Sequence, residues 1–151
     1  MRRISILGIV LGGIVAVAAI IIFGMGMGLY AAVKLDVAHQ RAPEQAQEIV
    51  RQYLFVNPVM YYGAMAIAFA CSVLGGWLSA FTAREAERLN GALSALVMGG
   101  FHWWKIAHHK DPHSMAVQAF YVFVLFAGAW LGGWLRAAQK ARSRPTVMTR
   151  A

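Results

Sequence analysis

The sequence LGGWL occurs twice in this chain, at residues 74–78 and again at residues 131–135. Each copy ends a long apolar stretch, and a charged segment follows that begins at Arg84 or at Arg136. Glycine pairs let helices approach closely within a bilayer, and tryptophan is enriched at the level of the lipid headgroups. Both copies therefore predict the end of a membrane-spanning helix, and both ends lie on the same side of the membrane.

The composition also indicates a membrane protein. The chain has 151 residues, of which 60% are hydrophobic and 13% are charged, whereas soluble domains carry about 25% charged residues. The net charge of +8 does not indicate a nucleic-acid partner, because the basic residues flank apolar stretches and do not gather on one face. The single cysteine, Cys71, excludes an intrachain disulfide. We therefore expect membrane lipids as partners and no nucleic acid.

Four apolar stretches predict membrane-spanning helices, at about residues 4–33, 59–83, 89–107 and 115–135. About 20 helical residues cross the ~30 Å hydrocarbon core, so the first stretch is long enough to tilt or to project beyond it. The third stretch is the least apolar. Short connections favour antiparallel neighbours. We expect an all-α membrane protein, with four transmembrane helices in an antiparallel bundle.

The remaining polar segments have separate interpretations. Residues 43–55 predict a short amphipathic helix at the membrane interface, because Pro43 suits a first helical position and apolar residues follow at helical spacing. Residues 1–138 are expected to form a single four-span domain, and residues 139–151 a basic cytoplasmic tail.

Small residues recur at every fourth position on the spans. The first span has Gly8 and Gly12, then Gly24 and Gly28. The second span carries a longer ladder of Ala64, Ala68, Ser72, Gly76 and Ala80. Such stripes allow a second helix to approach closely. We therefore expect the Gly76 face to meet another helix backbone at close range, and Gly133 to behave in the same way.

The two LGGWL copies lie 57 positions apart, from 74 to 131. One interpretation is a pair of repeated helical hairpins, related as a parallel internal repeat. The other is independent use of a motif that is common at span ends. The pattern Gly-Gly-aromatic-x-x-Ala before an arginine, at residues 74–84 and 131–138, resembles small four-span bacterial proteins, and the resemblance implies no activity.

Lysine and arginine predict the orientation. One side of the membrane carries nine of them, namely Arg2, Arg3, Arg84, Arg88, Arg136, Lys140, Arg142, Arg144 and Arg150. The other side carries five, namely Lys34, Arg41, Arg51, Lys105 and Lys110. Cytoplasmic loops are enriched in these residues. We expect a multi-pass protein of the bacterial inner membrane with both termini in the cytoplasm.

Four histidines near the end of the third span are candidate metal ligands, namely His102, His108, His109 and His113. Imidazoles bind zinc, copper, nickel and haem iron. A haem between spans would need ligands on two helices, and Met65 or Met98 could oppose His102. Pro112 argues against a continuous helix that holds His109 and His113 on one face. The alternative is a solvated histidine-rich loop that binds no cofactor.

The carboxylates argue against several mechanisms. All six lie in loops or at span ends, namely Asp36, Glu44, Glu48, Glu85, Glu87 and Asp111. Proton-coupled exporters normally carry an ionisable group inside the membrane, and channels carry polar rings or carbonyl filters. We expect no enzyme. The leading hypothesis is an accessory or assembly subunit that packs against other transmembrane helices of a larger complex, or against itself. The alternative is a metal- or haem-binding redox or transport component that uses the four histidines.

Overall fold

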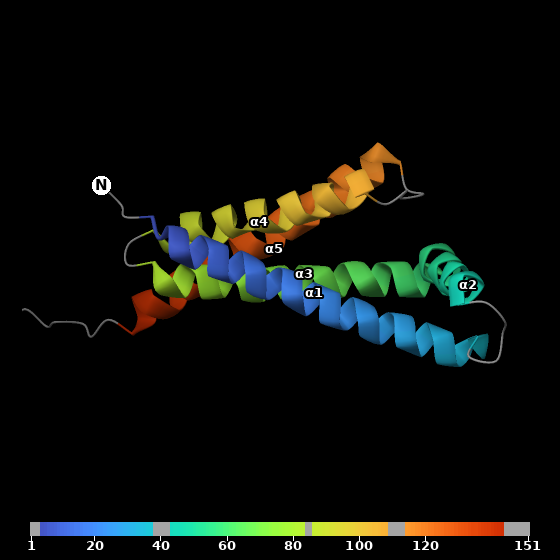
Figure 1. The fold of residues 1–151 in the computed structure, drawn as a ribbon. Helices are drawn as coiled ribbons and strands as arrows, with labels where there is room; N and C mark the ends of the chain where they lie inside the picture. Colours follow the sequence, from blue (N-terminus) through green and yellow to red (C-terminus); the bar gives the residue numbers. More distant parts are fainter. Residues whose placement is uncertain (1–3, 38–42, 84–85, 109–113, 144–151) are drawn as a thin grey trace, which may run out of the picture.

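The computed structural model describes residues 4–37, 43–83, 86–108 and 114–143. Within these residues the chain is all-α, with five helices packed as a bundle (Figure 1). The helices are α1 (Ile6–Lys34), α2 (Pro43–Val56), α3 (Pro58–Thr82), α4 (Glu87–His108) and α5 (Met115–Arg142). The five expected helices are therefore present. The largest difference in bounds is at α5, which continues beyond 135 to Arg142 and includes the first residues of the expected tail.

Local sequence explains where several helices begin and end. The Ser5 side chain caps α1 by accepting a hydrogen bond from the Gly8 backbone N–H. Asn57 caps α3 and accepts from the Val59 N–H at 3.0 Å, while Pro58 occupies the first helical position and needs no acceptor. After α1, Asp36 adopts a left-handed conformation with φ of 50°, which ends the helix.

Three helices of the described residues are long and apolar enough to cross a membrane, namely α1, α3 and α5. Large apolar side chains cover their outer faces, with Ile22 66% exposed, Leu74 58% and Phe123 66%. In a bilayer such side chains meet lipid tails, and the tails are as apolar as the side chains. The three helices suggest a multi-pass membrane protein. The expected third span, α4, is a helix as predicted but is less apolar than these three.

One glycine of each pair lies in the contact between α3 and α5. Both α3 and α5 run in the same direction, and a Cβ atom built on Gly76 would overlap the backbone carbonyl of Ala129 on α5. A Cβ atom on Gly132 would likewise overlap the Val73 carbonyl on α3. The expectation that the Gly76 face meets a helix backbone is confirmed. The tight partner is the parallel helix α5, whereas a simple antiparallel bundle would pair sequence neighbours most closely.

The remaining glycine of each pair, Gly75 or Gly133, contacts a different helix. A Cβ atom on Gly75 would lie 2.6 Å from the Ala16 Cβ on α1, and one on Gly133 would lie 3.0 Å from the Gly91 Cα on α4. Gly75 is the first glycine of its pair and contacts α1, which would form a repeated hairpin with α3. Gly133 is the second glycine of its pair and contacts α4, which would form a repeated hairpin with α5. The copies therefore occupy non-equivalent environments, unlike those of an exact two-fold repeat of hairpins.

One end of the bundle, called here the closed end, is held by hydrogen bonds around Asn90. The Asn90 side chain is fully buried, donates to the Ser5 carbonyl at 3.1 Å and accepts from the Ser5 backbone N–H at 3.2 Å. The buried Ser79 hydroxyl donates to the Asn90 carbonyl at 2.8 Å. These bonds join the beginning of α1, the end of α3 and the beginning of α4.

Charged and aromatic side chains surround the closed end. Trp77 Nε1 donates to Gln139 Oε1 at 2.9 Å, and the Arg136 guanidinium lies 4.4 Å from the centre of the Phe81 ring. Lys140 forms an ion pair with Glu87, which joins α5 to α4. Tryptophan, arginine and lysine at one level are typical of a membrane interface.

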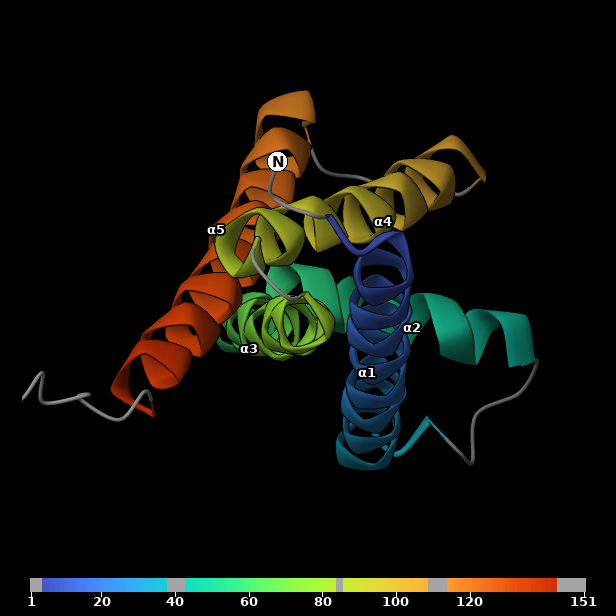
Figure 2. The same ribbon diagram turned by 90° about the vertical axis from the view of Figure 1, so that its left-hand side faces the viewer.

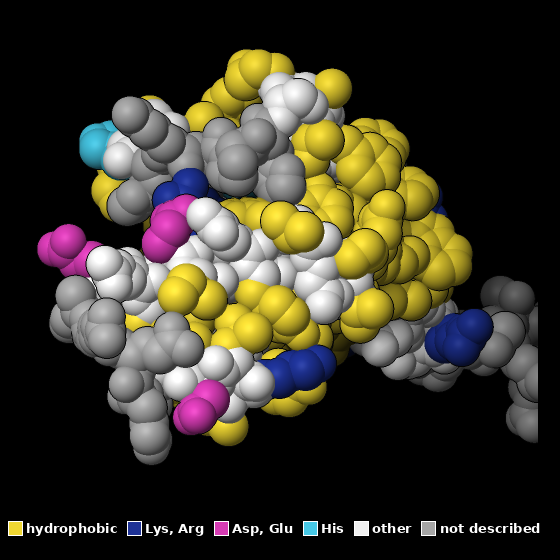
Figure 3. Space-filling view, turned by 90° about the vertical axis from the view of Figure 1, so that its right-hand side faces the viewer, with side chains coloured by type: hydrophobic (Ala, Val, Ile, Leu, Met, Phe, Trp, Pro, Cys, Tyr) yellow, Lys and Arg dark blue, Asp and Glu magenta, His cyan; other side chains and the backbone are white. Residues whose placement is uncertain are grey.

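The opposite end, called here the open end, contains α2, the beginning of α3 and the end of α4. Here α4 and α5 diverge from α1 and α3, and α2 lies across the bundle axis (Figures 1 and 2). Charged side chains and histidine appear on this end beside an extensive hydrophobic flank (Figure 3). An amphipathic helix in this position fits the predicted interfacial segment.

The divergence of the helices at the open end leaves part of the small-residue stripe on α1 uncovered. Gly8 and Gly12 are packed against α3 as expected, but a Cβ atom on Gly24, Gly26 or Gly28 would meet no described atom within 4 Å. No described helix of this chain covers the Gly24 and Gly28 part of the stripe, so the close approach of another helix there stays a prediction. The physical reason for the uncovered part is the separation of α4 from α1 toward the open end.

Candidate functional site

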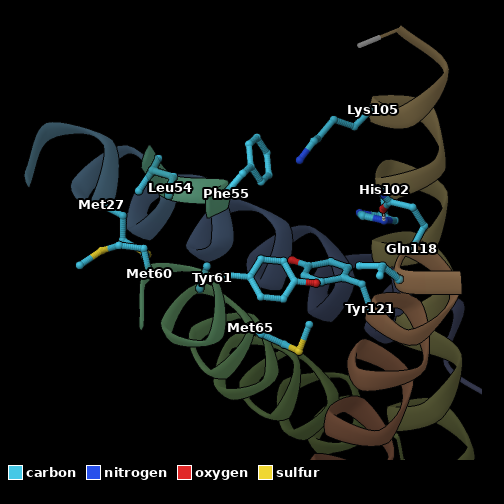
Figure 4. Close-up of a pocket in the computed structure, with 13 residues that line it drawn as sticks. Met27, Leu54, Phe55, Met60, Tyr61, Met65, His102, Lys105, Gln118 and Tyr121 are labelled. Carbon is cyan, nitrogen blue, oxygen red and sulfur yellow. Dashed lines mark hydrogen bonds between the residues drawn. The ribbon is translucent and has the colours of Figure 1, made fainter. Parts of the chain in front are cut away.

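The principal candidate site is a cavity of about 190 Å³ at the open end, where the diverging helices leave space (Figure 4). All five helices contribute to its wall. Its apolar lining consists of Gly24, Met27, Leu54, Phe55, Met60, Ala64, Met65 and Val117. Its polar lining consists of Tyr61, His102, Lys105, Gln118 and Tyr121. The site is therefore an apolar chamber with a small group of hydrogen-bonding side chains.

His102 and Gln118 form the buried polar centre of this wall. His102 is 7% exposed and Gln118 is 4% exposed, and they face each other from α4 and α5. His102 Nε2–H donates to Gln118 Oε1 at 2.8 Å. The imidazole also stacks on Tyr121, with 4.5 Å between ring centres and 24° between planes. This arrangement fixes the imidazole and joins α4 to α5 in the wall of the cavity.

Lys105 supplies the positive charge of the cavity. It follows His102 by one turn of α4, and Figure 4 shows its ammonium group directed toward the cavity. The described residues that line the cavity include no aspartate or glutamate. Tyr61 from α3 and Tyr121 from α5 add hydroxyl groups, which can donate or accept hydrogen bonds. The lining thus combines one cation, neutral hydrogen-bonding groups and a larger apolar surface.

The structure separates the two described members of the histidine cluster. His108 lies at the exposed end of α4, where its Nδ1–H donates to the Trp104 carbonyl at 2.8 Å. It follows His102 by six residues, so the two are ~9 Å apart along the helix axis and point in different directions. His109 and His113 lie outside the described residues. No group of three or more potential metal ligands occurs among the described residues, and the four-histidine metal site stays a prediction.

The two methionines considered as haem ligands lie in different places. Met98 is 1% exposed and belongs to the packed core with Ala95 and Leu125. Met65 lines the same cavity as His102, from the facing helix α3. Only Met65 is therefore placed beside the space that His102 borders.

Sequence reasoning missed Gln118, Tyr61 and Tyr121 as site residues. Gln118 had a usable signal, since it is a strongly polar residue within the predicted span 115–135. Intramembrane polar residues usually have an interior partner. Tyr61 gives no such signal, because a tyrosine beside Tyr62 near a span end is typical of a membrane interface.

Comparison with known proteins adds no family assignment: no family model, no curated protein and no solved structure matches this chain.

Proposed function

We propose that this protein crosses the membrane four times, with α4 as the additional span. The 22 residues of α4 have a length of ~33 Å, which is enough for a ~30 Å hydrocarbon core. Its polar residues Asn90, Ser94 and His102 are all buried against other helices. The low average hydropathy of α4 therefore comes from these buried side chains and from the charged or polar residues at its two ends, Glu87, Arg88, Lys105 and His108.

Four crossings place both termini on one side of the membrane. The beginning of α1 and the ends of α3 and α5 lie together at the closed end (Figure 1). This end corresponds to the side with nine of the 14 lysine and arginine residues. The positive-inside rule supports a cytoplasmic closed end. We propose the bacterial inner membrane as the location.

The function that we propose is that of a non-catalytic accessory or assembly subunit that packs against further transmembrane helices. The observation that carries it is the open glycine segment of α1, Gly24, Gly26 and Gly28. Glycine within a helix has a low helix propensity, and close helix packing compensates for this in membranes. Gly8, Gly12 and Gly13 have that compensation within the chain. A helix of a partner, or of a second copy of this chain, would supply the close packing that the open segment lacks.

The test is the size and composition of the native assembly in a mild detergent. We expect the parent to migrate with a further polypeptide or as an oligomer, and Gly28→Leu to weaken this association. A Cβ atom at Gly28 meets no described atom within 4 Å, so the added side chain starts in open space within this chain. Ile22→Leu, at a 66% exposed position of the same helix, is the matched control. A parent that migrates as a lone monomer would contradict the proposal.

A second candidate function is a metal- or haem-binding redox or transport component. One observation favours it, since His102 and Met65 border the same cavity from facing helices. Against it, His102 Nε2 already donates to Gln118. An absorption spectrum and elemental analysis of the purified protein decide this question: a Soret band or stoichiometric metal would support the cofactor function over the subunit function.

A further inference from the structure

We propose that the cavity at the open end binds an anionic phospholipid, with the phosphate at Lys105 and one acyl chain in a groove between α1 and α3. This inference goes beyond the subunit function, although Gly24 lines the cavity and Gly26 borders the groove; Gly28 lines neither space and tests the subunit function alone. It rests on the charge of the cavity, on the groove that lies beside it, and on the direction in which the groove runs.

The polar part of the cavity suits a negatively charged group. Lys105 directs its ammonium toward the cavity (Figure 4), and the described lining offers no carboxylate to neutralise it. Tyr61 and Tyr121 line the same space and have hydroxyl donors. A phosphate accepts hydrogen bonds from such donors and pairs with lysine. Lysine near a helix end also reaches the headgroup level of a bilayer.

A groove on the flank of the molecule lies beside the apolar part of the cavity. This groove has a volume of about 380 Å³ and is bordered by Phe23, Gly26, Met27, Tyr30, Val59, Met60, Gly63 and Ile67. Met27 and Met60 line both the cavity and the groove. Flexible methionine side chains adapt readily to an apolar ligand. An acyl chain would pass from the cavity to the groove at these two side chains, which can change rotamer to let it through.

The size of the two spaces favours an elongated ligand. Typical pockets for compact ligands have volumes of about 300–1,000 Å³, whereas the cavity alone has about 190 Å³. A headgroup fits in the cavity and an acyl chain requires the groove. At Gly26 and Gly63, a Cβ atom would meet no described atom within 4 Å, so both glycines leave the groove wide.

The groove runs in the direction that a membrane lipid requires. Val59, Met60, Gly63 and Ile67 lie on the first turns of α3, which begins at the open end and continues toward the closed end. A headgroup at the open end therefore places its acyl chain toward the middle of the bundle. This is the orientation of a lipid in the leaflet that surrounds the open end.

The experiment measures lipid binding to the full chain in detergent by native mass spectrometry. The probes are phosphatidylglycerol and phosphatidylcholine with identical acyl chains. We expect the parent to prefer phosphatidylglycerol, and Lys105→Gln to lower this preference by a factor of about 2–5, the range of a partly exposed ion pair. Equal binding of both lipids by the parent, or an unchanged preference in Lys105→Gln, would overturn the proposal.

Two further variants test the acyl chain. Gly63→Phe places a ring in the groove, and we expect it to reduce the binding of both lipids at least about fivefold, which corresponds to the loss of one well-packed apolar contact. Gly100→Phe is the matched control, since Gly100 also lies within a helix and has no described atom within 4 Å of a built Cβ atom. Equal losses in both variants would overturn the groove assignment.

A final arm separates a lipid site from a site for a free anion. Inorganic phosphate is added at millimolar concentration to the parent with bound phosphatidylglycerol. We expect the lipid to stay bound, because its acyl chain contributes most of the apolar contact. Full displacement by phosphate would show a free-anion site and would overturn the lipid proposal.

Discussion

Replacing Gly76 with alanine tests the contact on which the bundle depends. The added Cβ atom would overlap the Ala129 carbonyl oxygen and would lie 2.7 Å from the Ala129 Cα and carbonyl carbon. All three atoms belong to the backbone, so no side chain can rotate away and α3 must move from α5. Overpacking of this kind costs roughly 1–3 kcal/mol. We expect Gly76→Ala to lower the free energy of unfolding by this amount.

The assay is thermal unfolding in a single detergent, followed by circular dichroism. For a chain of this size, 1 kcal/mol shifts the midpoint by ~3 °C, so the expected decrease is roughly 3–9 °C. Gly63→Ala is the control on the same helix, because its Cβ atom meets no described atom within 4 Å. There alanine should be neutral or slightly stabilising, since it is the better helix former. If the unfolding midpoint of Gly76→Ala equals or exceeds that of Gly63→Ala, the close packing of α3 on α5 is refuted.

Three further predictions concern the closed end and the lipid face. Asn90→Leu removes the acceptor of the partly buried Ser5 backbone N–H and one of two donors to the Ser5 carbonyl, which keeps the Ile9 N–H. We expect a loss of ~0.5–1.5 kcal/mol in denaturant unfolding, and no change would show that these hydrogen bonds are not formed in solution. A double-mutant cycle on Glu87→Gln and Lys140→Gln should give a coupling energy below ~1 kcal/mol, as both side chains are partly exposed, and a coupling of several kcal/mol would contradict that exposure. Gly133→Leu should lower the melting midpoint, because Gly91 lies directly opposite. Phe126→Leu, at a 42% exposed position, should have a midpoint close to that of the parent. A lower midpoint for Phe126→Leu than for Gly133→Leu would contradict the packing.

The helices could be predicted from the sequence, but their pairing could not. Apolar stretches, Pro43 and Pro58 gave bounds close to those of the structure, and the small-residue ladder identified Gly76 as a contact residue. A ladder, however, shows which face is smooth and does not identify the helix that covers it. The partner Ala129 depends on how α5 crosses α3, and this depends on the packing of all helices together.

The candidate site was only partly predictable for a related reason. His102 stood out as a polar residue near the end of a span, and it borders the cavity. The cavity itself results from the divergence of α4 and α5 at the open end, a tertiary property that no local pattern encodes. Gly24 and Gly28 have the same spacing as Gly8 and Gly12, yet only the latter are packed.

The contact between Gly76 and Ala129 has a consequence for biosynthesis. The two LGGWL copies are 57 positions apart, and at ~5–20 residues per second a ribosome needs about 3–11 s to make that length. During this interval α3 can already pair with α1 through Gly75 and Gly12, while its Gly76 face has no partner in the nascent chain. The last hairpin, joined by Gly91 and Gly133, then completes the protein in one step. A chain that ends before α5 would therefore lack the helix that covers the Gly76 face of α3, and this surface would stay open to other helices.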